Sequence, residues 1–258
     1  MTTSVADLLT DLPVPESLRL PAGVSTGLSD LDSLTDGMLP GLWVVGGDHG
    51  VGLGMWLTQL AGQAAEHDLS THLQSPRDDE RRVVARLLAA QARVPLHHLE
   101  HDQARLTDQD RHRMDVAAER LSASPLLLRL GERAVALSAW SVEAAGDARL
   151  LVVNDANLLS ESFMSLADDL RAAAVARNCT VVLGLPRHQV QSRDSTVSQP
   201  WDSAADVAIV LERPDTLDNE SPRAGEIDLY VLRHRNGPVT VISAAFQAHY
   251  ARIVDLQR

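Results

Sequence analysis

The sequence predicts an α/β fold with a mainly parallel sheet, helices on both faces and an antiparallel edge at its C-terminal end. Short runs that are apolar at every position, as in strands buried on both faces, alternate with longer segments of helical periodicity. A cluster of glycines follows the first of these runs, and two strand-like segments lie in succession near the C-terminus. The 258 residues, 45% of them hydrophobic, are enough for one sizeable core.

Each element rests on a local pattern. Continuous apolar runs predict buried strands at 42–45, around Leu73, and at 150–153, 180–183 and 207–211. Helical spacing or alanine-rich composition predicts helices at 55–67, 79–93, 106–121 and 163–177. The last two strands are expected at 226–233 and 239–246, where they form the antiparallel edge.

Two regions are expected along the chain. Residues 1–22 contain Pro13, Pro15 and Pro21 within a short stretch, which predicts an N-terminal arm. Residues 23–258 then form the α/β domain. In such a sheet, ligands bind at the carboxyl ends of the strands, and the glycine cluster follows the strand at 42–45 at such an end.

Composition restricts the function. The net charge is -12 and all 23 basic residues are arginine, so a nucleic-acid contact needs a local arginine patch. The sequence contains no apolar stretch long enough to span a membrane and no signal-peptide pattern, which predicts a cytoplasmic protein that does not contact membranes. Cys179 is the only cysteine and precedes an apolar run, so we expect it in the core.

The glycine cluster at 46–54 has the context of a phosphate-binding loop, G-x-x-x-x-G-K-[ST]. Gly47 and Gly52 match its two glycines, but Leu53 stands at the lysine position and Gly54 at the hydroxyl position. Backbone N–H groups can still face an anion, whereas the cation for the phosphates and a Mg²⁺ ligand are missing. ATP and Mg²⁺ are therefore expected only if this altered loop still binds, and no other cofactor is expected. The candidate nucleotide-binding residues are Gly47, His49, Gly50, Val51, Gly52, Leu53 and Gly54.

Several segments, in order, resemble the RecA-like P-loop NTPase domain of DnaB-type replicative DNA helicases. They are 25–37, 46–54, 86–89, 150–155, 205–213 and 233–238. Together they span residues 23–250, and the Arg235-Asn236-Gly237-Pro238 turn and the segment at 25–37 are the most specific. The resemblance implies a RecA-like fold in a helicase C-terminal-type domain.

The chain departs from this family where the family does chemistry. Asn154 stands at the metal-binding aspartate of Walker B, and Asp155 follows one residue later. Alternation along a strand is expected to turn Asp155 to the opposite side, so its catalytic role is doubtful. The family's catalytic glutamate falls within 74–77, which has no carboxylate, and its phosphate-sensing glutamine falls near Pro186. Four altered elements together predict a degenerate, non-hydrolysing pseudoenzyme.

Two further groups of arginines are implied by the resemblance. Arg233 and Arg235 match a finger hairpin that acts on the nucleotide of a neighbouring subunit, which suggests a finger supplied in trans. The alternative is that 236–238 is only a hairpin turn. Arg187 and Arg193 fall in the region that lines the family's DNA channel and are weak candidates for DNA contact.

No metal site is predicted. The segment His97-His98-Leu99-Glu100-His101 matches H-x-x-E-H, in which two histidines share one helix face. Pro95 precedes it and no third ligand is evident, so the segment is interpreted as a solvated surface.

Three functions stay open. The first is a catalytically inactive interaction or regulatory protein, with a protein partner or as a homo-oligomer, in DNA replication or recombination. The second is an active DNA-dependent ATPase or helicase with an arginine at the glycine loop and Asp155 in the metal site. The third is a nucleotide or anion sensor without hydrolysis.

Overall fold

The computed structural model describes residues 23–131, 136, 146–159, 163–191, 204–217 and 221–256. The predicted arm at 1–22 therefore lies outside the described residues. Within them, nine strands form one sheet in the order β3-β2-β4-β5-β1-β6-β7-β8-β9. The strands are β1 Gly41–Gly47, β2 Thr71–Ser75, β3 Leu126–Leu130, β4 Leu150–Val153, β5 Thr180–Pro186, β6 Val207–Glu212, β7 Glu226–His234, β8 Thr240–Gln247 and β9 Arg252–Asp255.

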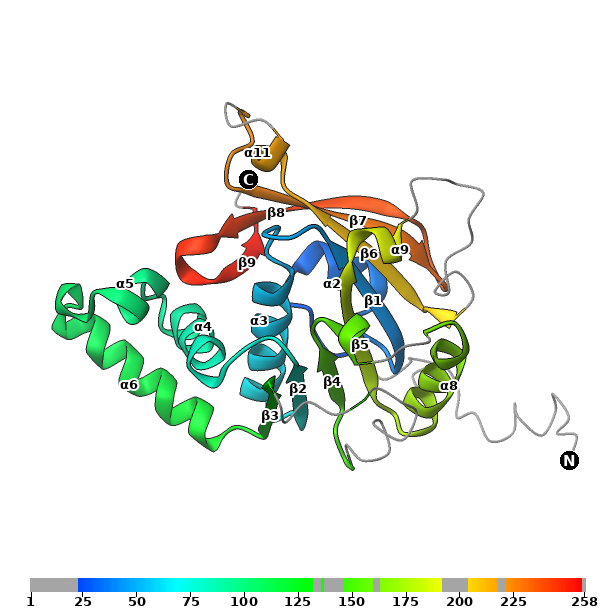
Figure 1. Ribbon diagram of the computed structural model, residues 1–258, viewed down its shortest axis with the longest axis horizontal. Coiled ribbons are helices and arrows are strands. Elements are labelled where there is room, and N and C mark those ends of the chain that lie inside the picture. Colours follow the sequence, from blue (N-terminus) through cyan, green and yellow to red (C-terminus); the bar gives the residue numbers. More distant parts are fainter. Residues whose placement is uncertain are drawn as a thin grey trace, which may run out of the picture.

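The sheet is parallel from β3 to β6 and antiparallel from β6 to β9. In Figure 1 the antiparallel strands extend across the top of the molecule, beyond the parallel part. The predicted fold class, including the antiparallel C-terminal edge, is confirmed.

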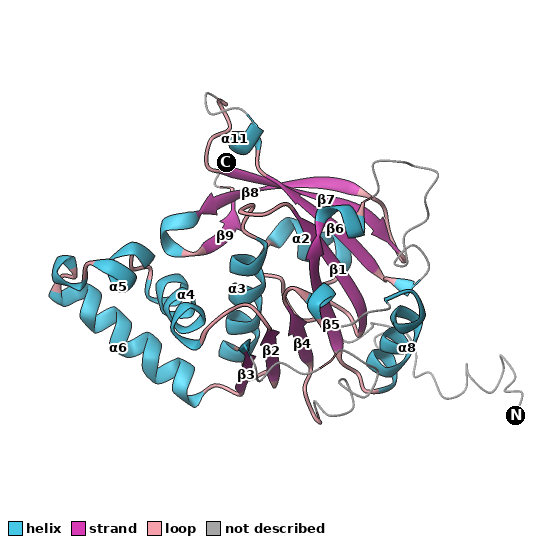
Figure 2. Cartoon of the chain, in the orientation of Figure 1, coloured by secondary structure: helices cyan, strands magenta, loops and turns pink. Residues whose placement is uncertain are grey.

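Helices cover both faces of the parallel part (Figure 2). The helices are α2 Ser29–Thr35, α3 Leu53–Glu66, α4 Glu80–Ala92, α5 Leu96–His101, α6 Asp108–Ala123, α8 Phe163–Ala176, α9 Arg187–Val190 and α11 Pro214–Leu217. Short 3-10 turns are η2 Gln103–Arg105, η4 Ala156–Leu158 and η5 Ala248–Tyr250. In the described residues no helix is both long and apolar enough to cross a membrane.

The two faces form separate apolar cores because side chains alternate along each strand. On β1, Trp43 and Val45 pack with α3 and α4, whereas Leu42 and Val44 pack with α8. Cys179 belongs to the second core, as predicted, and burial raises the pKa of its thiol to about 11.

Predicted helix boundaries at 79–93 coincide with the caps of α4. The Asp79 carboxylate accepts a hydrogen bond from the Arg82 N–H at the first turn, and Arg93 ends the helix in the left-handed conformation. Helices and strands at the other predicted positions end within a few residues of the expected bounds, apart from the longer β5. The elements that were not predicted are α2, β3, β9 and the short helices α5, α9 and α11.

The carboxyl ends of β1, β2, β4 and β5 meet at one edge of the sheet, because these strands are parallel and adjacent. This edge carries the glycine loop between β1 and α3, and it is where a RecA-like sheet places a ligand.

Candidate nucleotide site at the carboxyl edge

The glycine loop borders a cavity of about 450 Å³ at this edge. Of the predicted binding residues, those that line the cavity are Gly47, His49, Gly50, Gly52, Leu53 and Gly54. Val51 is different. Its side chain is buried in the core, and its N–H already donates to the Asp48 carbonyl at 3.1 Å. Val51 is therefore positioned as a core residue of the loop and does not line the cavity.

Two glycines give the loop its shape. Gly52 has a φ of 107°, and a Cβ there would lie 2.5 Å from Cε2 of Phe246. Gly50 also has a positive φ, of 83°, but a Cβ there would meet nothing within 4 Å. The loop thus needs glycine at 52 for both conformation and space, and at 50 for conformation alone.

Leu53 and Gly54 begin α3 at the edge of the cavity. The Leu53 side chain is partly buried and packs against the core of α3 and the sheet. A Cβ on Gly54 would lie 3.0 Å from Nδ2 of Asn154, so Asn154 occupies the space beside this position.

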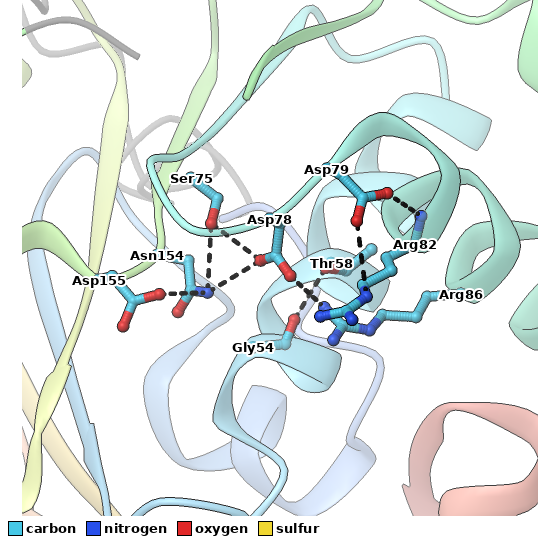
Figure 3. Close-up of polar contacts among 9 residues, drawn as sticks. All are labelled: Gly54, Thr58, Ser75, Asp78, Asp79, Arg82, Arg86, Asn154 and Asp155. Carbon is cyan, nitrogen blue, oxygen red and sulfur yellow. Dashed lines mark hydrogen bonds and ion pairs between the residues drawn. The ribbon is translucent and has the colours of Figure 1, made fainter. Parts of the chain in front are cut away.

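Asn154 lies at the centre of a polar cluster (Figure 3). Its Nδ2 group points to Oδ2 of Asp78 and to Oδ2 of Asp155, each at 3.3 Å, and to the Ser75 hydroxyl at 3.5 Å. The Ser75 hydroxyl donates to Asp78 at 2.8 Å, and Arg86 donates to the other oxygen of Asp78 at 2.9 Å. With carboxylates on both sides, the donor end of the amide must face them, because its oxygen would be repelled.

Asp155 lines the same cavity as Asn154, and the expectation that it faces away is wrong. Strand β4 ends at Val153, and Asp155 adopts a left-handed conformation with a φ of 49°. Strand alternation no longer applies beyond Val153, so the turn brings its carboxylate to the cluster. Burial raises the pKa of Asp155, the nearby Arg77 opposes this rise, and the neighbouring Asp78 adds to it.

Asp78 is a cavity residue that the sequence interpretation missed. It directly precedes Asp79, and only Asp79 caps α4. Asp78 instead faces the cavity, with its side chain 13% exposed. The segment 74–77 indeed has no carboxylate, and one follows immediately after it. No local pattern separates the two aspartates, since their difference arises from the turn between β2 and α4.

Arginines reach the glycine loop from β6 and α9, and acids accompany them. Arg187, a DNA-contact candidate, forms ion pairs with Glu212 at 2.8 Å and with Asp48 at 3.4 Å. Arg213 forms an ion pair with Asp215 at 3.0 Å, and its guanidinium stacks 4.1 Å from the centre of the Phe246 ring. The other DNA-contact candidate, Arg193, lies outside the described residues.

The hairpin arginines lie at the opposite edge of the sheet. Val207, at the start of β6, pairs with His234, whereas Leu211 near its end pairs with Gly47 of the loop. Arg235 forms an ion pair with Asp206 at 2.7 Å, and Arg233 donates to the Ala205 carbonyl at 2.7 Å. Neither guanidinium can reach its own chain's glycine loop, so a role as a finger is confined to a neighbouring subunit and stays a prediction.

Among the described residues no group of three or more histidine, cysteine or acidic side chains is arranged to hold a metal ion. The rings of His97 and His101 lie 5.5 Å apart on the six-residue α5. None of the residues of this helix is buried, in line with the predicted surface segment.

Comparison with known proteins agrees with the fold. The family model "DnaB-like helicase C terminal domain" matches residues 23–181, more than half of the chain. The replicative DNA helicase DnaB of Leifsonia xyli subsp. xyli is 28% identical over 261 residues, which cover 91% of this chain and 56% of that protein. The replicative DNA helicase DnaC of Bacillus subtilis is 24% identical over 262 residues, covering 92% and 57%. The chain thus spans about half the length of these curated relatives.

Solved structures support the same fold. The ATPase domain of G40P matches over the whole of both chains with a TM-score of 0.80 and 19% identity. A DnaB-like replicative helicase, solved in a study of its interactions with primase, matches all of this chain and 68% of its own, with a TM-score of 0.81 and 20% identity. The RadB recombinase matches 91% of this chain and all of its own, with a TM-score of 0.58 and 17% identity.

Proposed function

The chain belongs to the DnaB-like helicase C terminal domain family, and we propose that it is a member that does not hydrolyse ATP and acts by binding other proteins in DNA replication or recombination. The observation that carries this proposal is the Asn154 amide between Asp78 and Asp155. An amide N–H group donates hydrogen bonds and cannot ligate a cation. It contacts both carboxylates at the place where a Mg²⁺ ion would need them.

The first turn of α3 supports the proposal independently. Leu53 contributes an apolar side chain to the core, and Gly54 has no hydroxyl for a metal. The sequence contains no lysine that could replace the missing cation. Arg86, Arg187 and Arg213 approach the cavity or the loop, but each is paired with an acid of the chain. Arg77 also lines the cavity, near Asp155. With no lysine, no hydroxyl at 54 and an amide between the two carboxylates, the residues present do not fit ATP with Mg²⁺.

A second candidate is an ATPase with atypical residues. Asp155 and Arg77 line the cavity beside the ion pair of Asp78 with Arg86, so carboxylates and guanidinium groups both border it. In this alternative, Asn154 has to move away from the carboxylates before a metal ion binds. The third candidate, an anion sensor, uses the loop backbone and these arginines without chemistry.

The test is calorimetry of the purified chain with ATP and Mg²⁺, together with phosphate release with and without single-stranded DNA. We expect neither binding nor release. Binding without release identifies the sensor. DNA-stimulated release that is lost in Asp155→Ala but kept in the remote variant Arg177→Ala overturns the proposal and supports the atypical ATPase.

The partner is proposed to be a component of the replication apparatus or a second copy of the chain. One structural neighbour was solved in a study of its interactions with primase. In a mixed assembly with an active helicase of the family, Arg235→Ala tests the finger. An unchanged rate of ATP hydrolysis excludes the role in trans and leaves Arg235 as a structural partner of Asp206.

A further inference from the structure

A second cleft lies between α3, α4, α6 and β9, away from the residues of the carboxyl-edge site. It consists of two adjoining cavities of about 280 and 440 Å³. Both are lined by Glu66, Gln91, Arg93 and Arg120. In Figure 1 these elements lie together on the left of the molecule. Cavities of this size are in the range that small molecules occupy.

The cleft is basic although the chain is acidic. Arg93, Arg120 and Arg252 line the smaller cavity, and Arg93 and Arg120 also line the larger one. Within the described part of the chain, no acidic side chain forms an ion pair with any of these three arginines, whereas many other arginines have such a partner. Arg252 donates a hydrogen bond of 2.6 Å to the side-chain amide oxygen of Gln247, which is an uncharged group. Burial lowers the pKa of Arg252, and the nearby positive charge of Arg93 lowers it further. Two like charges therefore lie close together in the cleft.

Glutamine amides in the same walls have polar atoms that are buried without a partner. Both amide atoms of Gln91 and Oε1 of Gln63 have no hydrogen-bond partner among the described residues. Gln59, on the same wall, is fully paired. Its Nε2 donates to the Ile253 carbonyl at 2.8 Å, and its Oε1 accepts from the Ile253 N–H at 2.7 Å. A buried amide without partners is costly. These atoms are enclosed, but both side chains line the cleft, so a turn of either amide into the cavity brings its unpartnered atoms to a ligand there.

From these two observations we infer that the cleft binds a small phosphate ester that also carries hydrogen-bond donors, as sugar phosphates and nucleotides do. Guanidinium groups are suited to phosphate oxygens. The unpartnered carbonyl oxygens of Gln63 and Gln91 need donors, which a phosphate dianion lacks and a sugar or a base supplies. The net charge of -12 repels anions at long range, so binding depends on the local arginines.

Glu66 is the acidic residue of the cleft lining and opposes the ligand's charge. Burial raises the pKa of Glu66, and the nearby Arg120 opposes this rise. Replacing this carboxylate by an amide is expected to strengthen binding without changing the shape of the cleft. An affinity that increases on Glu66→Gln is a result that a merely structural cluster would not give.

The experiment is calorimetry of the full chain at low ionic strength with ribose 5-phosphate, AMP and inorganic phosphate. We expect saturable binding of at least one ester, roughly fivefold or more tighter than that of phosphate, because the amides gain partners. The two esters distinguish a sugar phosphate from a nucleotide. No saturable binding, or equal affinity for phosphate alone, overturns the inference.

Variants locate the site. The pair Arg93→Asn and Arg120→Ala is expected to weaken binding about tenfold or more. Asparagine is chosen at 93 because the φ there is 52°, which asparagine tolerates. Arg177→Ala, which removes one exposed positive charge directly after α8 and far from the cleft lining, is the control for each single arginine change, and it leaves the affinity unchanged.

The glycine loop must be excluded as the binding site. Gly50→Asp places an acid in the loop where a Cβ meets nothing within 4 Å, and it should leave ester binding unchanged. If Gly50→Asp abolishes binding and the arginine pair does not, the ligand occupies the loop and the inference is wrong. Circular dichroism of each variant confirms that it is folded. The result is independent of ATP hydrolysis, so this inference and the proposed function fail separately.

Discussion

At the residue scale, Asp155 gives the chain a pH-dependent property. Burial raises its pKa in the folded state, so the charged form is less stable there than in the unfolded chain. This penalty is fully present above the raised pKa and disappears as the pH falls below the ordinary aspartate pKa of about 3.9. Asp155→Asn removes the charge and suits the left-handed backbone at this position.

We therefore expect Asp155→Asn to increase the free energy of unfolding at pH 7, with a gain that shrinks as the pH falls towards 4. Urea unfolding of both proteins at pH 7, 5 and 4 measures it. Any conformational benefit of asparagine is independent of pH. The way in which the difference in free energy of unfolding between the two proteins varies with pH therefore reports the charge alone. A difference that stays constant across this range contradicts the assigned cause.

The sequence identified those site residues whose position follows from spacing along the chain, and missed those whose position depends on the geometry of a turn. Leu53, Gly54 and Asn154 were identified as departures because the loop and the apolar strand place them by spacing alone. Asp78 and the orientation of Asp155 were not, since each depends on a turn after a strand end, and the left-handed φ of Asp155 has no signature in its neighbours. The pairing of Arg187 with Glu212 joins distant segments and could not be predicted either, whereas Arg213 pairs with Asp215, two residues along the chain.

At the element scale, the glycine loop is held against the antiparallel edge by Phe246. Gly52→Ala places a Cβ 2.5 Å from that ring in addition to the unfavourable φ of 107°. We expect a loss of about 3 kcal/mol in the free energy of unfolding, from strain and overpacking together. Gly50→Ala is the matched control, with a φ of 83° and no contact, and should cost about 1 kcal/mol.

Urea denaturation of both variants measures this difference. Equal losses would mean that Phe246 moves aside without cost and does not hold the loop. Arg213 also stacks on this ring, 4.1 Å from its centre, which favours a fixed ring.

Elements were predictable where their burial was uniform. β1, β4, β5 and β6 are buried along nearly their whole length, and their apolar runs predicted them. β3 has four leucines in five residues and was overlooked although its apolar run indicates a strand; it lies at the edge of the sheet and is only partly buried. β9 has two apolar residues between two charged ones, so its pattern is weak. α2 has seven residues and lies within the segment that was interpreted as a lead-in to the first strand.

At the scale of the whole molecule, the fold matches that of an ATPase domain, and we propose that the nucleotide site has changed in several elements together. The match to the ATPase domain of G40P covers the complete chain with a TM-score of 0.80. If the changes are confined to the site, restoring its residues should restore binding. The variant Leu53→Lys, Gly54→Thr and Asn154→Asp returns the cation, the hydroxyl and the metal-binding carboxylate.

We expect this triple variant to bind ATP with Mg²⁺ in calorimetry, whereas each single change does not. Lysine at 53 can keep its aliphatic stem on the core and extend its charge into the cavity. A Cβ at 54 would lie 3.0 Å from Asn154 Nδ2, and aspartate at 154 has the same size, so the side chain at 154 has to shift slightly in either case. An aspartate there can accept a hydrogen bond from the threonine hydroxyl, which the Nδ2 group cannot. The carboxylate that Asn154→Asp introduces is repelled by Asp78 and Asp155 without a cation, so Mg²⁺ should also raise the melting temperature of the variant but not that of the native chain. A folded triple variant that binds no nucleotide would show that the loss extends beyond these three positions, into the turn at 74–77 or the end of β5 at Pro186.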